Sequence, residues 1–184
     1  MLLYQSGDER AFDRLVELYS GRLYALLTRF LGPVSEREDL LQEVFIRVIR
    51  ARERYQPTAR FSTWLYRITF NLAVNRTQRD PGLVSLEASH DLGEGGQLGP
   101  EADPGDRPES ELERNDVVAA VRRAIDSLPA SQRMALVLAK FEEMPYAEIA
   151  KVMGSSEKAI KSMIHRAREN MRARLAPFLQ EEAT

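Results

Sequence analysis

The sequence predicts an all-α protein made of two small helical domains that a flexible acidic linker joins. Apolar residues recur at helical spacing near both ends of the chain. The segment between them is rich in glycine, proline and acidic residues and lacks helical or strand periodicity. A glycine turn between two predicted helices near the C-terminus is typical of a helix-turn-helix. We therefore assign the first domain to residues 1–80, the linker to 81–112 and the second domain to 113–178.

Composition restricts the class of protein further. Hydrophobic residues make up 43% of the 184 residues, which is enough for packed cores. No apolar run approaches the roughly 20 residues that span a bilayer, and no secretory signal is visible. The absence of cysteine excludes disulfides, thiolate nucleophiles and Cys-based zinc sites. We expect a soluble cytoplasmic protein without membrane insertion.

The charges are segregated along the chain. Residues 1–79 hold 13 basic and 9 acidic side chains, residues 80–116 hold 2 and 11, and residues 117–184 hold 11 and 8. The three segments therefore carry net charges of +4, −9 and +3, although the whole chain carries only −2. Two basic blocks joined by an acidic tether suggest nucleic-acid contacts at both ends.

The first predicted helix spans residues 8–31, and Gly32-Pro33 ends it. Its predicted role is to cover the apolar sides of the next two helices. Ser35 and Glu38 have capping-box spacing, so the second helix should begin there.

The second helix carries two different faces. One is apolar, and the opposite one includes Asp39, Gln42, Glu43 and Ile46. An apolar Ile46 within a charged face indicates a docking surface. The alternative is a solvated outer face with one stray isoleucine, because single exposed apolar residues are ordinary.

The third helix has a clear entry signal, since Phe61, Ser62 and Tyr66 fit a hydrophobic staple around a serine N-cap. Between its two apolar flanks runs a stripe of Trp64, Arg67, Asn71, Asn75 and Gln78. Amides donate and accept hydrogen bonds, and an aromatic ring can stack on bases. Residues 44–79 contain eight arginines and one acidic residue, Glu53, as in a surface that contacts phosphates. However, arginine-rich helices also occur as solvated faces, and a lone helical tryptophan is more often part of a core.

Helical periodicity returns at about Glu109, and Pro129 ends that helix. A short, strongly apolar and therefore buried helix follows. Another short helix then begins at Pro145, Gly154 makes a turn, and Ser156 is the expected N-cap of a long basic helix.

The long helix, predicted from Glu157 to about Leu175, has one apolar arc that can pack. Its opposite side, which could enter a major groove, carries Lys158, Lys161, Ser162 and His165. Arg166 and Arg168 flank that side and could reach phosphates.

The run E-D-L-L-Q-E-V-F from Glu38 and the run F-S-T-W-L-Y-R-I-T-F-N from Phe61 resemble region two of bacterial sigma factors of the extracytoplasmic-function (ECF) group, within the sigma-70 family. The resemblance implies that the second helix docks on core RNA polymerase through Asp39, Gln42, Glu43 and Ile46. It also implies that the following loop and helix bind and open the minus-ten promoter element. We expect that surface to consist of Arg60, Trp64, Arg67, Asn71 and Asn75.

The C-terminal third resembles region four of the same group, which reads the minus-thirty-five element. The stretch L-P-A-S-Q-R-M-A-L from Leu128 and H-R-A-R from His165 carry this resemblance. The sequence departs from the family pattern at Glu143, where glycine is common, and at Met163, where arginine is common. The family linker threads the polymerase active-site cleft, whereas the plainer interpretation of residues 81–112 is a passive spacer.

No pattern for catalysis, a metal or a cofactor is evident. Asp39 and Glu43 share one helical face, but a solvated or partner-facing carboxylate pair is the preferred interpretation. His90 and His165 lack metal-ligand spacing, and no phosphate-binding glycine motif or nucleophile elbow is present. We therefore expect a non-enzymatic initiation factor whose partners are core RNA polymerase, promoter DNA and an anti-sigma factor. The rivals are a stand-alone helix-turn-helix regulator and a DNA-processing enzyme that uses the Asp39–Glu43 pair.

Overall fold

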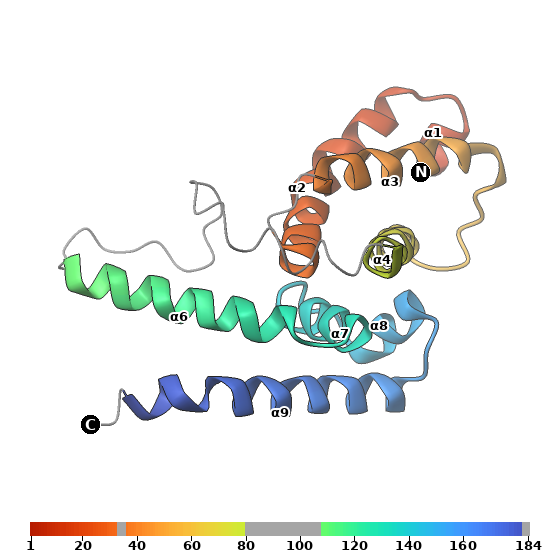
Figure 1. Cartoon of the computed structure of the whole chain (residues 1–184). Helices are drawn as coiled ribbons and strands as arrows, with labels where there is room; N and C mark the ends of the chain where they lie inside the picture. The colour runs from red at the N-terminus through yellow and green to blue at the C-terminus, as the bar shows by residue number, and fades with distance from the viewer. Residues whose placement is uncertain (33–35, 80–107, 182–184) are drawn as a thin grey trace.

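The computed structural model describes residues 1–32, 36–79 and 108–181, and side chains at residues 1–32, 36–78 and 116–178. All regular structure in these parts of the chain is helical (Figure 1), which confirms the predicted all-α class. Most of the acidic linker and Ser35 lie outside the described residues, so the predicted flexibility and serine cap stay predictions.

Residues 1–79, the first half, form a helical bundle. Its elements are α1 (Leu2–Gln5), α2 (Arg10–Leu31), α3 (Arg37–Arg50), the short 3-10 turn η1 (Arg52–Arg54) and α4 (Phe61–Arg79). The long helix predicted over residues 8–31 is confirmed as α2, which begins two residues later. Its buried side packs against α3 and α4 through residues such as Leu23, Leu26 and Leu27.

The start of α4 differs from the prediction. The helix begins at Phe61, and the backbone N–H of Trp64 donates to the carbonyl of Arg60 at 3.2 Å. Ser62 therefore lies inside the first turn and does not cap the helix. The staple pattern was misleading because Phe61 packs in an aromatic cluster with Tyr19, Tyr55 and Trp64, and that cluster places the start of the helix.

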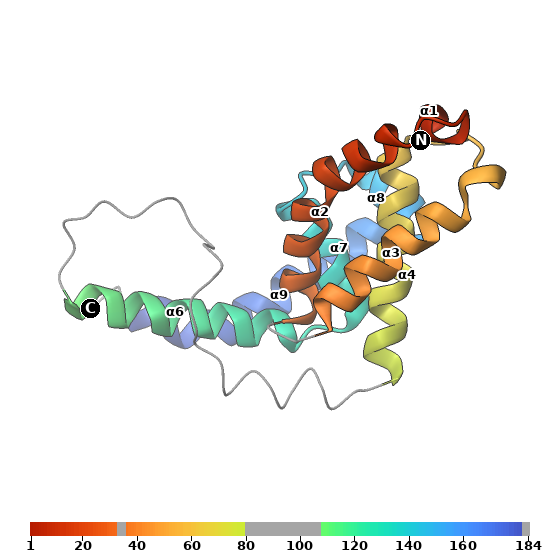
Figure 2. The same ribbon diagram turned by 90° about the horizontal axis from the view of Figure 1, so that it is seen from above.

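Residues 108–181, the second half, contain α6 (Pro108–Asp126), α7 (Ala130–Lys140), α8 (Tyr146–Met153) and α9 (Glu157–Glu181). The predicted glycine turn is confirmed, because Gly154 ends α8 in the left-handed conformation with φ of 62°. Ser156 caps α9 as predicted, since its hydroxyl accepts from the backbone N–H of Ala159 at 3.2 Å. Helices α8 and α9 form the helix-turn-helix, and α6 and α9 extend together beyond the bundle (Figure 2).

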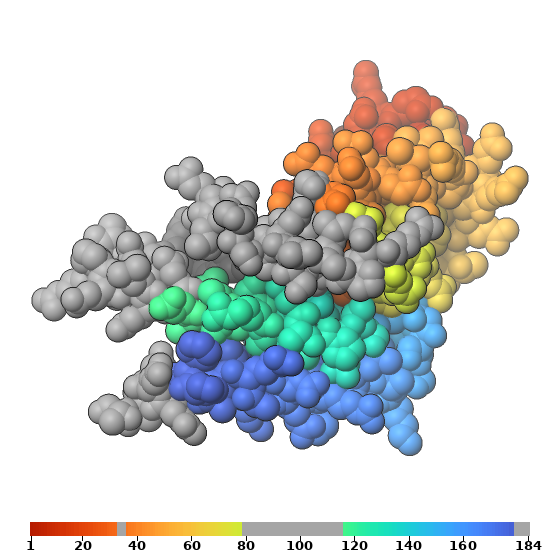
Figure 3. All heavy atoms as spheres, viewed as in Figure 1, coloured from red at the N-terminus to blue at the C-terminus, as the bar shows by residue number. Residues whose placement is uncertain are grey.

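The two halves share one hydrophobic core. Leu23, Leu65 and Val44 of the first half belong to the same buried cluster as Met134 and Ile149 of the second half. Helix α8 packs along α4, and α7 packs against α2 and α4. In the space-filling view the second half lies directly against α4 (Figure 3). The chain is therefore closed, with its helix-turn-helix held against the first half.

Candidate nucleic-acid interface

The α3 face consists of Asp39, Gln42, Glu43 and Ile46. Asp39, Gln42 and Ile46 are exposed, and Ile46 retains 39% of its accessible surface. Glu43 is half-buried and accepts a hydrogen bond from Arg47 Nε at 3.0 Å. The opposite side of α3 buries Val44 completely, so this helix anchors in the core and presents a mixed acidic and apolar surface outward.

The α4 stripe consists of Arg60, Trp64, Arg67, Asn71 and Asn75. The four polar members are exposed and lie along one side of the helix and the residue before it. No acidic residue occurs within α4 itself, so the stripe offers cationic and amide donors to an anionic partner.

The position of Trp64 agrees in part with both interpretations of the sequence, a core residue and a surface on which bases stack. It is half-buried, and its ring contacts those of Tyr55 and Phe61 at centroid distances of 5.1 and 5.6 Å. The ring thus packs at the edge of the aromatic cluster while part of it faces solvent beside the stripe. A half-buried ring held by other rings is a rigid platform for stacking.

The α9 face consists of Lys158, Lys161, Ser162, His165, Arg166 and Arg168. All six side chains are exposed, whereas Ile160, Ile164 and Ala167 on the other side of the helix are buried. Met163, the departure from the family pattern, is half-buried and packs against the shared core. It therefore stabilises the packed side of α9 and leaves the polar side free.

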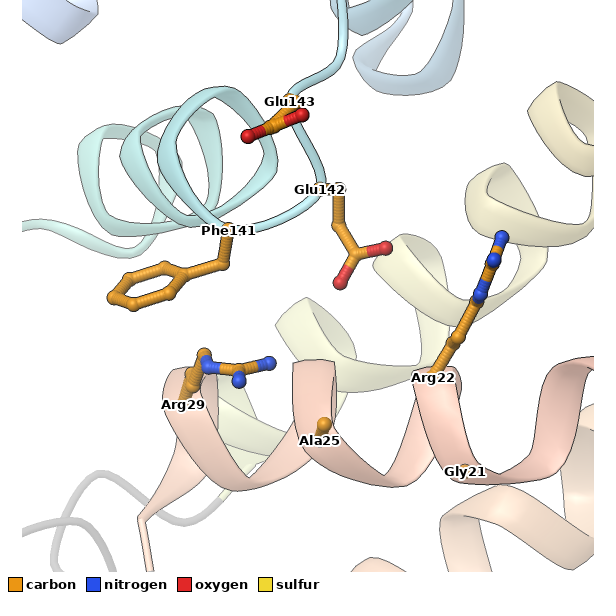
Figure 4. A pocket seen from close by; sticks show the side chains of 7 residues that line it. All are labelled: Gly21, Arg22, Ala25, Arg29, Phe141, Glu142 and Glu143. Carbon is orange, nitrogen blue, oxygen red and sulfur yellow. The ribbon is translucent and has the colours of Figure 1, made fainter. Parts of the chain in front are cut away.

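The backbone at Glu143, the other departure, explains why glycine is common at this position. Its φ is +49°, a left-handed conformation that glycine adopts at the least cost. It belongs to the loop after α7, which faces α2 across a pocket of about 430 Å³ (Figure 4). The guanidinium of Arg29 of α2 lies over the ring of Phe141 of this loop, with Cζ 4.7 Å from the ring centroid.

Polar contacts between the halves, which the sequence did not reveal, involve two buried hydroxyls on the packed side of α4. The hydroxyl of Thr63 donates to Glu148 Oε2 at 2.7 Å, and that of Tyr66 donates to Glu142 Oε2 at 2.5 Å. Hydrogen bonds from Lys151 and from Thr63 lower the pKa of Glu148, and the nearby charge of Arg60 acts in the same direction. Burial raises the pKa of the Tyr66 hydroxyl, and its bond to Glu142 adds to that effect.

Arg133 also links the two halves, a role that the sequence did not indicate. Its side chain is 5% exposed and donates to the backbone carbonyls of Phe30 (2.8 Å), Leu128 (3.2 Å) and Asp126. An arginine whose side chain links the two halves cannot be recognised from the spacing of residues in the sequence, because its acceptors include backbone atoms distant in sequence.

Neither a metal nor a membrane site is apparent in the described part of the chain. Its His, Asp and Glu side chains form no group of three or more that could hold a metal ion. None of its helices combines the length and the apolar character that crossing a bilayer requires. Asp39 and Glu43 thus form an acidic pair on an exposed helical face.

Comparison with known proteins identifies the family. The family model for sigma-70 region 2 matches residues 15–80, and that for sigma-70 region 4 matches residues 119–171. The RNA polymerase sigma-H factor of Pseudomonas aeruginosa is 36% identical over 181 residues, which cover 96% of this chain and 92% of the relative. The ECF sigma factor SigW of Bacillus subtilis is 33% identical over 93% of this chain and 92% of its own length. The chain belongs to the ECF sigma factors.

Solved structures agree with this assignment. This ECF sigma factor aligns with CnrH, solved in complex with the cytosolic domain of CnrY, with a TM-score of 0.66, 25% identity and coverage of 94% of this chain and 92% of that one. The sigma factor RpoE of Bartonella quintana, solved with the anti-sigma factor NepR, has the same fold, with a TM-score of 0.64, 21% identity and coverage of 91% and 98%. The resemblance in the sequence is therefore confirmed, and the relatives are sigma factors rather than stand-alone regulators.

Proposed function

We propose that this ECF sigma factor engages its polymerase and promoter through three separate surfaces. The α3 face docks on core RNA polymerase, the α4 stripe binds and opens the minus-ten element, and the α9 face reads the minus-thirty-five element. The observation that supports this assignment is that most residues of each surface are exposed and lie on or next to helices within the segments that match regions two and four. The functional units are residues 1–80 and 113–178, with 81–112 as their tether.

Each surface suits its proposed target chemically. The α3 face combines carboxylates with the exposed Ile46, and because carboxylates repel DNA phosphates, this face suits a protein partner better than DNA. In the α4 stripe, arginines contact phosphates while Trp64, Asn71 and Asn75 stack on or hydrogen-bond to bases of a separated strand. The N-terminal turns of α9 enter a major groove, where Lys158, Lys161 and Ser162 meet base edges and Arg166 and Arg168 contact phosphates.

Joining two weak DNA-binding units on one polymerase raises their combined affinity. Once one unit is bound, the second binds at an effective concentration that the tether and the enzyme set. We therefore expect weak, unspecific DNA binding by the free chain and specific binding only with core polymerase. The chain supplies no catalytic groups in this scheme and works in the cytoplasm with the polymerase.

The decisive experiment is transcription reconstituted with bacterial core RNA polymerase and a randomised promoter library. The expected result is selection of a two-part promoter, with one conserved block near position minus ten and another near minus thirty-five. Gel shifts with and without core enzyme accompany it. Tight, specific duplex binding without polymerase would contradict the proposal and favour a stand-alone regulator.

A protein inhibitor is the proposed means of control. CnrH, which shares this fold, was solved with the cytosolic domain of a second protein, CnrY. We infer that an anti-sigma factor binds this chain in the same way and keeps it from polymerase. Co-purification from the native host, followed by a transcription assay with the captured protein, tests this inference.

A further inference from the structure

The α3–α4 segment, residues 51–60, connects the helix that carries the α3 face to the α4 stripe. Residues 56–60 are all exposed, and within them the backbone N–H of Thr58 donates to the carbonyl of Gln56 at 2.8 Å. Under the proposed function this part of the segment and α4 together meet the minus-ten element. An exposed connection is mobile unless its ends are anchored. The position of residues 56–60 therefore depends on what holds residues 51–55.

Helix α1 holds the backbone of those residues through one side chain. It lies beside η1 and the end of α3, as both ribbon views show (Figures 1 and 2). The side-chain amide of Gln5 donates from Nε2 to the carbonyl of Glu53 at 3.3 Å and to that of Tyr55 at 3.1 Å. One amide group thus supplies a donor to two backbone acceptors of the α3–α4 segment.

Arg52 provides a second link between the segment and the N-terminal part of the chain. Its guanidinium lies over the ring of Tyr4, with Cζ 4.4 Å from the centroid, and donates to Glu9 Oε1 at 2.6 Å. Tyr4 is 4% exposed, and its ring packs on that of Phe12 of α2 at a centroid distance of 5.1 Å. The packing of Tyr4 keeps α1 in place, so Gln5 donates from a fixed support.

Tyr55 connects this anchor to the α4 stripe. Its side chain is 8% exposed, and its ring contacts those of Phe61 and Trp64 at 6.2 and 5.1 Å. The residue whose carbonyl accepts from Gln5 therefore also supports the ring that is proposed to stack on bases. A platform that is held before DNA arrives does not have to be ordered on binding, which lowers the entropic cost of binding.

We propose that Gln5 is a positioning residue for promoter opening, which holds the backbone of Glu53 and Tyr55 so that Trp64 and residues 56–60 are in place to receive unpaired bases. The inference rests on the proposed function, which assigns the minus-ten element to this surface and gives α1 no role. Gln5 acts through Tyr55 and makes no DNA contact of its own in this scheme.

The experiment compares the wild-type chain with Gln5→Met, which keeps a side chain of similar length and the same charge but removes the amide donor. The matched control is Gln132→Met, at another half-buried glutamine, which on α7 accepts from Asn170 at 3.2 Å. Trp64 is the only tryptophan in the sequence, so acrylamide quenching of its fluorescence in the free chain measures the accessibility of the platform.

The same variants are then assayed with core RNA polymerase. Permanganate footprinting over time gives the rate of strand opening on a promoter recovered from the randomised library. Size-exclusion chromatography gives binding to core enzyme, which a positioning role for Gln5 leaves unchanged.

For Gln5→Met we expect stronger quenching of Trp64 and strand opening about three- to tenfold slower than in wild type, because two backbone acceptors lose their donor. Binding to core polymerase should stay at the wild-type level, and Gln132→Met should match wild type in every assay. Unchanged quenching or an unchanged opening rate in Gln5→Met would overturn the inference, as would an equal effect in Gln132→Met or a parallel loss of core binding. Failure of the proposed function appears separately, as a lack of promoter-directed transcription by wild type, and the quenching assay does not depend on polymerase.

Discussion

Gly32 is required by both its backbone and its surroundings. Its φ is +92° with ψ of −171°, and a Cβ atom there would lie 2.7 Å from Nη2 of Arg122. That guanidinium donates to the carbonyl of Thr28 at 2.9 Å, so it links the end of α2 to α6. An alanine would strain the backbone and displace this bond.

We predict that Gly32→Ala lowers the free energy of unfolding by about 1–3 kcal/mol, measured by urea denaturation. Gly21→Ala is the control, because Gly21 lies within α2 and no neighbouring atom comes within 4 Å of its added Cβ. The control should be neutral or stabilising by up to about 1 kcal/mol. Equal losses in the two variants would refute the conformational argument.

Arg133 stabilises the junction between the halves at the level of one side chain. Its replacement by alanine leaves the buried Phe30 carbonyl without its donor and removes one of two cations from the Asp126 carboxylate, which Arg122 Nε still approaches at 3.2 Å. We expect a loss of about 1–3 kcal/mol in urea unfolding, the range for leaving a buried acceptor unsatisfied. Arg123→Ala, at an exposed position of the neighbouring helix α6, should change stability by less than about 0.5 kcal/mol.

At the scale of single elements, α3 divides its residues between packing and docking. Glu43 pairs with Arg47 on the outer side, an exposed i,i+4 pair worth about 0.3–0.5 kcal/mol. Glu43→Lys should therefore leave the melting temperature almost unchanged while abolishing binding to core polymerase. Size-exclusion chromatography with core enzyme measures this, and Glu17→Lys on the exposed side of α2 is the charge-matched control. An intact complex with the Glu43 variant would place the docking surface elsewhere.

The residues of helix α9 likewise divide into a buried apolar side that packs and an exposed basic side that is proposed to contact DNA. Lys161 is exposed and pairs with Glu157 at 3.1 Å, and such a solvated i,i+4 pair is worth only about 0.3–0.5 kcal/mol, so DNA can replace Glu157 as its partner. Lys161→Ala should weaken holoenzyme binding to the minus-thirty-five element by about 1 kcal/mol or more. Lys140→Ala, at the exposed end of α7, removes the same charge away from the α9 face and should have little effect. Equal losses in filter binding would indicate a general charge effect.

At the scale of the whole molecule, the closed form should respond to acid. The pKa of Glu148 is lowered by its bonds to Lys151 and Thr63, and only the Thr63 bond requires closure. A lowered pKa means that the folded chain binds this proton less readily than the unfolded chain. The contribution to folding stability is therefore present above the ordinary glutamate pKa of 4.5, and it is lost as pH falls through the lowered value.

The free energy of unfolding measured with urea between pH 6 and pH 4 should thus fall in acid. A Glu148→Ala chain should show a weaker pH dependence than wild type. The same acid response in both chains would assign the effect to other carboxylates.

The sequence alone was sufficient for the order of the long helices, the exposed faces of α3 and α9, and the family, but not for the short α1 and η1. These features depend on local periodicity, on the glycine turn at Gly154 and on the Ser156 cap, all of which act within a few residues. Charge segregation along the chain likewise revealed two basic units without any knowledge of their packing.

Only the tertiary structure decided how those units meet. Thr63 and Glu148 are 85 residues apart, and Arg133 reaches the carbonyl of Phe30 across 103 residues. No spacing rule connects such partners, because which residues meet depends on the shape of the shared core. The start of α4 and the half-buried position of Trp64 also follow from packing among aromatic rings, which overrides the local capping signal at Ser62.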